Sequence, residues 1–148
     1  MALPLKDKVR SLGVRLDPSL SLEVQVGSVA RSTWGQLRLI RQLRPFLDRD
    51  NLATVVHALV TFRLDYCNAL YVGLPLKTTW KVQLVQNAAA RLLAGSSYRD
   101  HITPVLKELH WLPIRFRLEF KVLVMTFKAL NGLGPRYFRE RLSLYVPA

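Results

Sequence analysis

Acidic side chains are the first candidates for chemistry in this chain of 148 residues. Asp48 and Asp50 are the only closely spaced aspartates, whereas phosphoryl transfer by two metal ions needs several carboxylates that converge on the cations. The pair lies where a helix is predicted to begin, and there carboxylates usually accept hydrogen bonds from free backbone amides. We therefore predict a helix cap at this position and no metal site.

The histidines and the single cysteine do not form a recognisable ligand pattern. Cys67, His57, His101 and His110 lack the short paired spacings of a zinc site. The sequence also lacks the glycine-rich phosphate loop, the nucleophile elbow and the dinucleotide-binding turn. We expect no metal, no cofactor and no catalytic residue. A lone cysteine excludes an intramolecular disulfide and fits a reducing compartment.

Positive charge is the strongest compositional signal. The chain has 22 Lys and Arg residues against 10 Asp and Glu, a formal net charge of +12. Such a balance favours a polyanionic partner, such as RNA, DNA or an anionic membrane surface. The alternative is a soluble basic protein whose charge only keeps it in solution.

Three tryptophans could stack on nucleic-acid bases. They are Trp34, Trp80 and Trp111. Isolated aromatic residues in helical proteins more commonly anchor the core or its edge. We therefore predict a structural role for all three, and the same for His57, which falls beside an apolar stripe.

The clearest predicted helix extends from about residue 76 or 79 to residue 94, and Gly95 is suited to end it. Its apolar residues recur at spacings of three and four, which predicts one broad buried face. That face comprises Leu84, Val85, Ala88, Ala89, Leu92 and Leu93. Gln83, Asn87 and Arg91 line up on the opposite, polar edge, which we expect to be exposed and available to a nucleic acid.

The other predicted elements are a short strand and five helices. The strand covers residues 12–16, where apolar residues alternate. Ser19 or Ser21 is predicted to cap the first helix, and Thr103 followed by Pro104 to begin a short later one. The buried face of the second helix is predicted to extend to Phe62, Tyr66 and Leu70. The predicted helices are residues 21–43, 48–70, 103–109, 114–130 and 136–142.

Residues 114–122 illustrate an ambiguity between strand and helix. Polar and apolar residues alternate here, which by itself predicts a strand. Over a longer window the apolar residues follow helical spacings, Pro113 suits a first helical turn and Gly132 suits an end. We therefore predict one long helix whose apolar stripe comprises Phe116, Phe120, Leu123, Phe127 and Leu130.

These elements predict a mainly α fold, a helical bundle with a short N-terminal strand. No repeat, low-complexity tract or linker divides the chain, so we expect a single region over residues 1–148. No apolar run approaches the ~20 residues needed to cross a bilayer, and the N-terminus lacks the apolar core of a secretory signal. We expect a soluble intracellular protein that does not use a membrane.

Several short segments have the residues and the order of one known family. They are Arg-Pro-Phe-Leu at 44–47, Arg-Leu-Asp-Tyr-Cys-Asn-Ala-Leu at 63–70, Leu-Val-Gln-Asn-Ala-Ala-Ala-Arg-Leu-Leu at 84–93, His-Ile-Thr-Pro-Val-Leu at 101–106, and His-Trp-Leu-Pro at 110–113 with Lys-Ala-Leu-Asn-Gly at 128–132. They resemble the region after the palm in the reverse transcriptases of LINE-type (non-LTR) retrotransposons, most strongly the chicken-repeat-like branch. The resemblance extends from about Leu12 to the C-terminus.

The resemblance implies a thumb-like helical bundle. Residues 1–18 would be a remnant that follows the palm, residues 19–94 the thumb, and residues 95–148 a C-terminal helical segment. Full-length relatives are RNA-directed DNA polymerases that hold Mg²⁺ on an Asp-Asp motif, and no two aspartates are adjacent in this chain. We expect a chain that starts after that motif, lacks the endonuclease, the fingers and most of the palm, and is a catalytically inactive fragment or relic.

A retained role would then be binding of RNA or an RNA–DNA duplex through its phosphates. Helical placement and phosphate attraction select the basic residues Arg31, Arg38, Arg41, Arg44, Arg91, Arg115, Arg117 and Lys121. A solvated basic face without a ligand is the competing interpretation.

Two further hypotheses remain open. A thumb without its palm would expose apolar surface, and such surface marks interfaces. The chain could therefore bind a protein partner or itself through helix faces, without any nucleic-acid function. It could also be a polymerase subunit whose palm is supplied in trans.

Overall fold

The computed structural model describes residues 9–143. Within this range the protein is mainly α-helical, with one two-stranded antiparallel sheet at the N-terminal end. The predicted fold class, mainly α with a short N-terminal strand, is therefore confirmed. The outer parts of the predicted first and last segments, residues 1–8 and 144–148, lie outside the described residues.

The sheet is a hairpin of β1 (Val9–Ser11) and β2 (Val14–Leu16). Leu12 and Gly13 connect the strands with positive φ angles of 46° and 83°, as a two-residue hairpin turn requires. The Tyr66 hydroxyl donates a hydrogen bond of 2.6 Å to the Leu12 carbonyl oxygen. The predicted single strand is correct only in its second half, because its first residues form the turn.

The first long helix, α1 (Glu23–Leu43), starts differently from the prediction. Neither Ser19 nor Ser21 is its N-cap, which is Leu22 with a φ of 54°. The Ser21 hydroxyl instead donates to Asp17 Oδ2 at 2.6 Å, and its backbone N–H donates to Asp17 Oδ1 at 2.8 Å. The hydroxyl hydrogen bond is the main cause that lowers the pKa of Asp17. Serine here stabilises the turn before the helix.

The second helix begins at the predicted cap. A short 3-10 turn, η1 (Arg44–Phe46), leads from α1 toward α2 (Arg49–Val56). The Asp48 side chain accepts a hydrogen bond of 2.8 Å from the Asn51 backbone N–H. The prediction of a helix cap by this aspartate is confirmed.

The same helical rod continues through a π-helical turn, η2 (His57–Thr61), into α3 (Phe62–Asp65). Its buried side chains, four residues apart, are Leu52, Val56, Val60 and Leu64. A spacing of four residues is longer than one turn of an α-helix, so in a regular α-helix these side chains would drift around the axis. The wider π turn corrects this drift and keeps them on one face. The predicted extension of this face to Phe62, Tyr66 and Leu70 is wrong, because all three are exposed.

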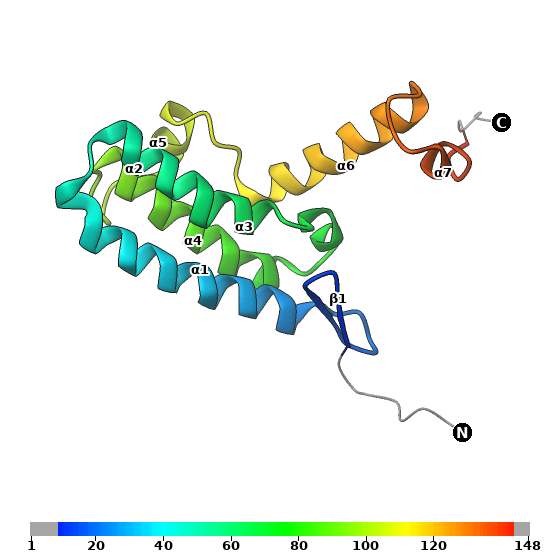
Figure 1. The fold of residues 1–148 in the computed structure, drawn as a ribbon, viewed down its shortest axis with the longest axis horizontal. Helices are drawn as coiled ribbons and strands as arrows, with labels where there is room; N and C mark the ends of the chain where they lie inside the picture. The colour runs from blue at the N-terminus through cyan, green and yellow to red at the C-terminus, as the bar shows by residue number, and fades with distance from the viewer. Residues whose placement is uncertain (1–8, 144–148) are drawn as a thin grey trace.

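The helix α4 (Leu76–Ala94) has the predicted bounds and occupies the centre of the fold. The 3-10 turn η3 (Asn68–Tyr71) precedes it, and Gly95 ends it with a φ of 67°. α4 contacts α1, α2, η2, α5 and α6. Figure 1 shows α1 and α4 side by side, with the rod of α2 and α3 returning along them. The shared core includes Val26, Leu37, Ile40, Val56, Val60, Val85 and Ala89.

Within the described residues, three helices follow α4. They are α5 (Ile102–Glu108), α6 (Ile114–Leu130) and α7 (Arg136–Arg139). The helical prediction for the ambiguous segment is confirmed by α6. The predicted start of α5 at Thr103 is wrong, because the N-cap is His101 and its side chain makes no capping hydrogen bond. None of the described helices is long and apolar enough to span a bilayer.

Most of α6 projects from the bundle, with α7 at its far end (Figure 1). Ile114 and Leu118 near its start are buried in the core. The apolar stripe that predicts the helix remains exposed along its whole length, at Phe116, Phe120, Leu123, Phe127 and Leu130. Helical periodicity therefore identified the helix, but no described element covers its apolar face.

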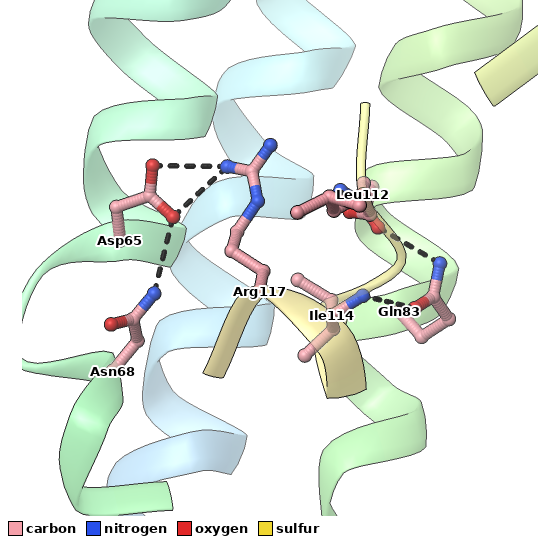
Figure 2. A network of polar contacts seen from close by, with 7 residues as sticks. Asp65, Asn68, Gln83, Leu112, Ile114 and Arg117 are labelled. Atoms are coloured by element: carbon pink, nitrogen blue, oxygen red, sulfur yellow. Dashed lines mark hydrogen bonds and ion pairs between the residues drawn. The ribbon is translucent and has the colours of Figure 1, made fainter. Parts of the chain in front are cut away.

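A polar network holds the start of α6 against α4 (Figure 2). Gln83 Oε1 accepts a hydrogen bond of 2.7 Å from the Ile114 N–H, and Gln83 Nε2 donates to Asn87 Oδ1 at 2.7 Å and to Gln86 Oε1 at 2.9 Å. Gln86 Nε2 donates to the Leu112 carbonyl oxygen at 2.8 Å. The prediction that Gln83 and Asn87 form an exposed edge of α4 is wrong, because the chain between α5 and α6 covers this edge.

Candidate nucleic-acid interface

A basic stripe follows one side of α1. Arg31, Trp34, Arg38 and Arg41 are separated by three, four and three residues, which places their side chains on one helical face. All four are exposed, and we refer to them as the α1 stripe. Three of the predicted cations therefore share a surface, and a tryptophan lies among them.

One end of the α1 stripe contributes to a pocket between the C-terminal halves of α1 and α4. The pocket has a volume of about 630 Å³, and its wall includes Trp34, Arg41, Arg44, Arg91 and Tyr98. We refer to it as the arginine pocket. None of the described residues that line it is acidic, so its electrostatic potential is positive. The fold thus brings together Arg41, Arg44 and Arg91, which lie far apart in sequence.

Arg91 is held in place by backbone carbonyl groups. Its Nε donates to the Ser97 carbonyl oxygen at 3.2 Å, and its Nη2 donates to the Asp100 carbonyl oxygen at 3.1 Å. The guanidinium carbon lies 5.6 Å from the centre of the Tyr98 ring, within the range of a cation–π contact. Carbonyl groups orient a guanidinium without cancelling its charge, so Arg91 keeps its positive charge in the pocket.

Arg41 and Arg44 have no such restraint. Among residues 9–143, neither forms an ion pair. Arg44 lies beside Gly95, where an added Cβ would be 3.2 Å from the Arg44 Nη2 atom. Helix C-termini favour cations by about 0.3–1 kcal/mol each, so the ends of α1 and α4 offset part of the repulsion between the guanidinium groups.

The predicted cations of α6 do not join this surface. Arg117 Nη1 lies 2.9 Å from both carboxylate oxygens of Asp65 and ties α6 to α3 (Figure 2). Arg115 forms an ion pair of 3.2 Å with Glu119. Lys121 lines a different pocket. The Arg117 side chain is mostly buried and forms an ion pair with Asp65, so it contributes to the attachment of α6 and lies outside the basic surface of α1.

The aromatic residues of the arginine pocket were not among the predicted binding residues. The predicted structural role holds for Trp111, which packs against the core with the His57 ring 5.6 Å away. Trp34 and Trp80 are partly exposed and belong to neither core cluster, so they are not core residues. The position of Trp34 between arginines at helical spacing was the available signal. Tyr98 follows α4 in a turn, and no sequence pattern indicated a binding role for it.

This arrangement is suited to binding. Residues 9–143 contain no group of three or more His, Cys, Asp or Glu side chains placed to hold a metal ion. Guanidinium groups bind anions, most strongly the planar or tetrahedral oxygens of carboxylate and phosphate. Exposed aromatic rings offer flat surfaces for planar ligands.

Comparisons with known proteins do not assign the chain to a family. No family model, curated protein or solved structure matches it.

Proposed function

We propose that this chain is a non-catalytic helical module that binds RNA or an RNA–DNA duplex through the α1 stripe and the arginine pocket. The convergence of Arg41, Arg44 and Arg91 in a pocket without acidic lining residues carries this proposal. Paired guanidinium groups match the geometry of phosphate oxygens. Contacts to phosphates supply most of the affinity that does not depend on sequence.

The salt dependence of binding tests the phosphate contacts. Affinity of the purified chain for a primer–template duplex is measured by fluorescence anisotropy over a range of salt concentrations. Each neutralised phosphate contributes about 0.9 to the slope of log affinity against log salt on duplex DNA. We expect a slope of about 3 or steeper from the cations of this surface. No binding, or binding indifferent to salt, would refute the proposal.

Charge reversal locates the surface. The double variant Arg41→Glu with Arg44→Glu should weaken duplex binding at least tenfold and flatten the salt slope. Lys77→Glu with Lys107→Glu is the matched control, because it changes the net charge by the same amount at exposed positions outside the arginine pocket. Equal losses in both double variants would mean that only net charge matters, and the assigned surface would be wrong.

We also propose that the module derives from the reverse transcriptase of a LINE-type retrotransposon. The shared segments and the mainly α fold support this origin, with α1 to α4 in the position of the thumb. The adjacent aspartates of the polymerase motif are missing from the sequence. We therefore expect no nucleotide incorporation on a primed template with Mg²⁺, and incorporation above background by the purified chain would overturn the non-catalytic assignment.

The exposed stripe of α6 favours a second candidate function, a helical interaction or self-association module. Phe116, Phe120, Leu123 and Phe127 are each more than half exposed on a helix that projects from the bundle. Contiguous apolar surface of this kind marks contacts between proteins. Its burial by another protein or by a second copy would need no nucleic acid.

Sedimentation at several protein concentrations tests self-association. We expect a concentration-dependent increase in mass that the variant Leu123→Glu abolishes, because a charge in the stripe would be costly to bury. Lys128→Glu, an exposed charged position on the same helix, is the control. A monomer at every concentration would exclude the self-associating form of this candidate.

A further inference from the structure

We propose that the arginine pocket holds one unpaired nucleotide of a single strand. Its base would stack on Trp34 or Tyr98, and its phosphate would bind Arg41 and Arg44. The inference deepens the proposed nucleic-acid function and rests on it. It goes further by assigning an unpaired base to the pocket, in addition to the phosphate that the proposed function already places there.

The charges of the pocket select an anion. Three guanidinium groups face a wall whose described residues include no carboxylate. Arg91 is already oriented by the Ser97 and Asp100 carbonyl oxygens. Arg41 and Arg44 are exposed and unpaired among residues 9–143, so they can turn toward a phosphate without breaking an ion pair.

The aromatic residues select a planar group next to that anion. Trp34 is 40% exposed and Tyr98 is 89% exposed, although both carry large apolar rings. Bases within a duplex are already stacked on their neighbours, whereas an unpaired base has free faces that aromatic side chains can cover. If the arginine pocket bound only duplex phosphates, the Trp34 ring and the part of the Tyr98 ring that Arg91 leaves free would stay exposed.

The size of the pocket suits one nucleotide. Its volume of about 630 Å³ falls within the range of roughly 300–1,000 Å³ that is typical of small-molecule sites. The α1 stripe continues from it through Arg38 to Arg31, over ten residues of helix. At 1.5 Å per residue this is about 15 Å, enough for neighbouring phosphates of the same strand.

The test compares ligands that differ only in their bases. One is a short single-stranded oligonucleotide, and the other is a strand of the same length in which every nucleotide is abasic. Both carry the same phosphates, so phosphate attraction alone predicts equal affinity. We expect the abasic strand to bind about tenfold more weakly or worse, which is the effect of losing one base stacked on an aromatic ring.

Variants of the pocket assign the difference to its aromatic residues. Trp34→Ala combined with Tyr98→Ala should remove the preference for the intact strand and leave the salt slope unchanged, because the phosphate contacts remain. Trp34→Phe combined with Tyr98→Phe should retain most of the preference. Trp80→Ala is the matched control, because Trp80 is also exposed on a helix but lines a different pocket. Circular dichroism verifies that each variant is folded.

The outcomes separate this inference from the proposed function. Equal, salt-dependent affinity for the intact and the abasic strand would overturn the nucleotide pocket and leave phosphate binding in place. A preference for the intact strand that persists in the double alanine variant would also overturn it. Failure to bind any strand or duplex would refute both.

Discussion

The ion pair between Asp65 and Arg117 offers the sharpest test of how α6 is attached to the bundle. Asp65→Asn and Arg117→Met, made singly and together, remove the charges while keeping side chains of similar length. Asp65 also accepts a hydrogen bond of 3.2 Å from Asn68 Nδ2 (Figure 2). The carboxylate therefore connects α3, η3 and α6, and we expect its loss to loosen the base of the projecting helix.

The expected magnitude follows from burial. The Arg117 side chain is 17% exposed and the Asp65 side chain is 38% exposed. Exposed pairs contribute about 0.2–1 kcal/mol, whereas breaking a fully buried pair costs about 3–5 kcal/mol. For this half-buried pair we expect a coupling energy of about 1–2 kcal/mol. Asp65→Asn should cost more than Arg117→Met, because it leaves the more buried charge without a partner.

Urea unfolding of the four proteins, followed by circular dichroism, gives the coupling energy from the double-mutant cycle. The pair of Arg136 and Glu140 is a matched control, with the same contact distance of 2.9 Å but side chains that are 92% and 61% exposed. Its coupling should be only about 0.3–0.5 kcal/mol. A coupling at the Asp65 pair no larger than in the control, or a larger loss from Arg117→Met, would refute the reasoning.

Three further predictions concern single residues. Gln83→Leu should destabilise the protein by about 1–3 kcal/mol, because it leaves the Ile114 N–H unpaired; urea unfolding against the exposed control Gln42→Leu measures this, and equal losses would contradict it. Arg91→Lys should speed amide hydrogen exchange in the loop after α4, because a lysine ammonium cannot replace both guanidinium contacts to its carbonyl groups; unchanged exchange would show that these contacts do not order the loop. Burial raises the pKa of Tyr71 above its ordinary value of 10.0, so its contribution to stability is complete below pH 10.0 and is lost as the pH rises through the raised pKa. Absorbance titration of tyrosinate should lose its most alkaline step in Tyr71→Phe, and a titration curve identical in shape would disprove this assignment.

The sequence by itself determined the bounds of α4 and α6 and the start of α2. Asp48 caps α2, Gly95 ends α4, and the long window around residues 114–130 identified α6 despite its alternating pattern. These features depend on interactions within a few residues of the chain, such as capping hydrogen bonds, backbone preferences and helical spacing. Local interactions of this kind depend only on the residues of the segment itself, so they can be predicted from its sequence.

Only the tertiary structure decided which side of each helix is covered. Gln83 points to the start of α6, Arg117 is paired with Asp65 of α3, and the apolar stripe of α6 is exposed. A π-helical turn, which no local signal marked, rotated Phe62 out of the core.

The candidate site follows the same division. The sequence singled out Arg41, Arg44 and Arg91 by charge and helical placement, but their meeting with Trp34 and Tyr98 arises from the parallel packing of α1 and α4. Burial and pocket formation depend on residues that are distant in sequence. Helical periodicity does not indicate which other element will pack against a given helix face.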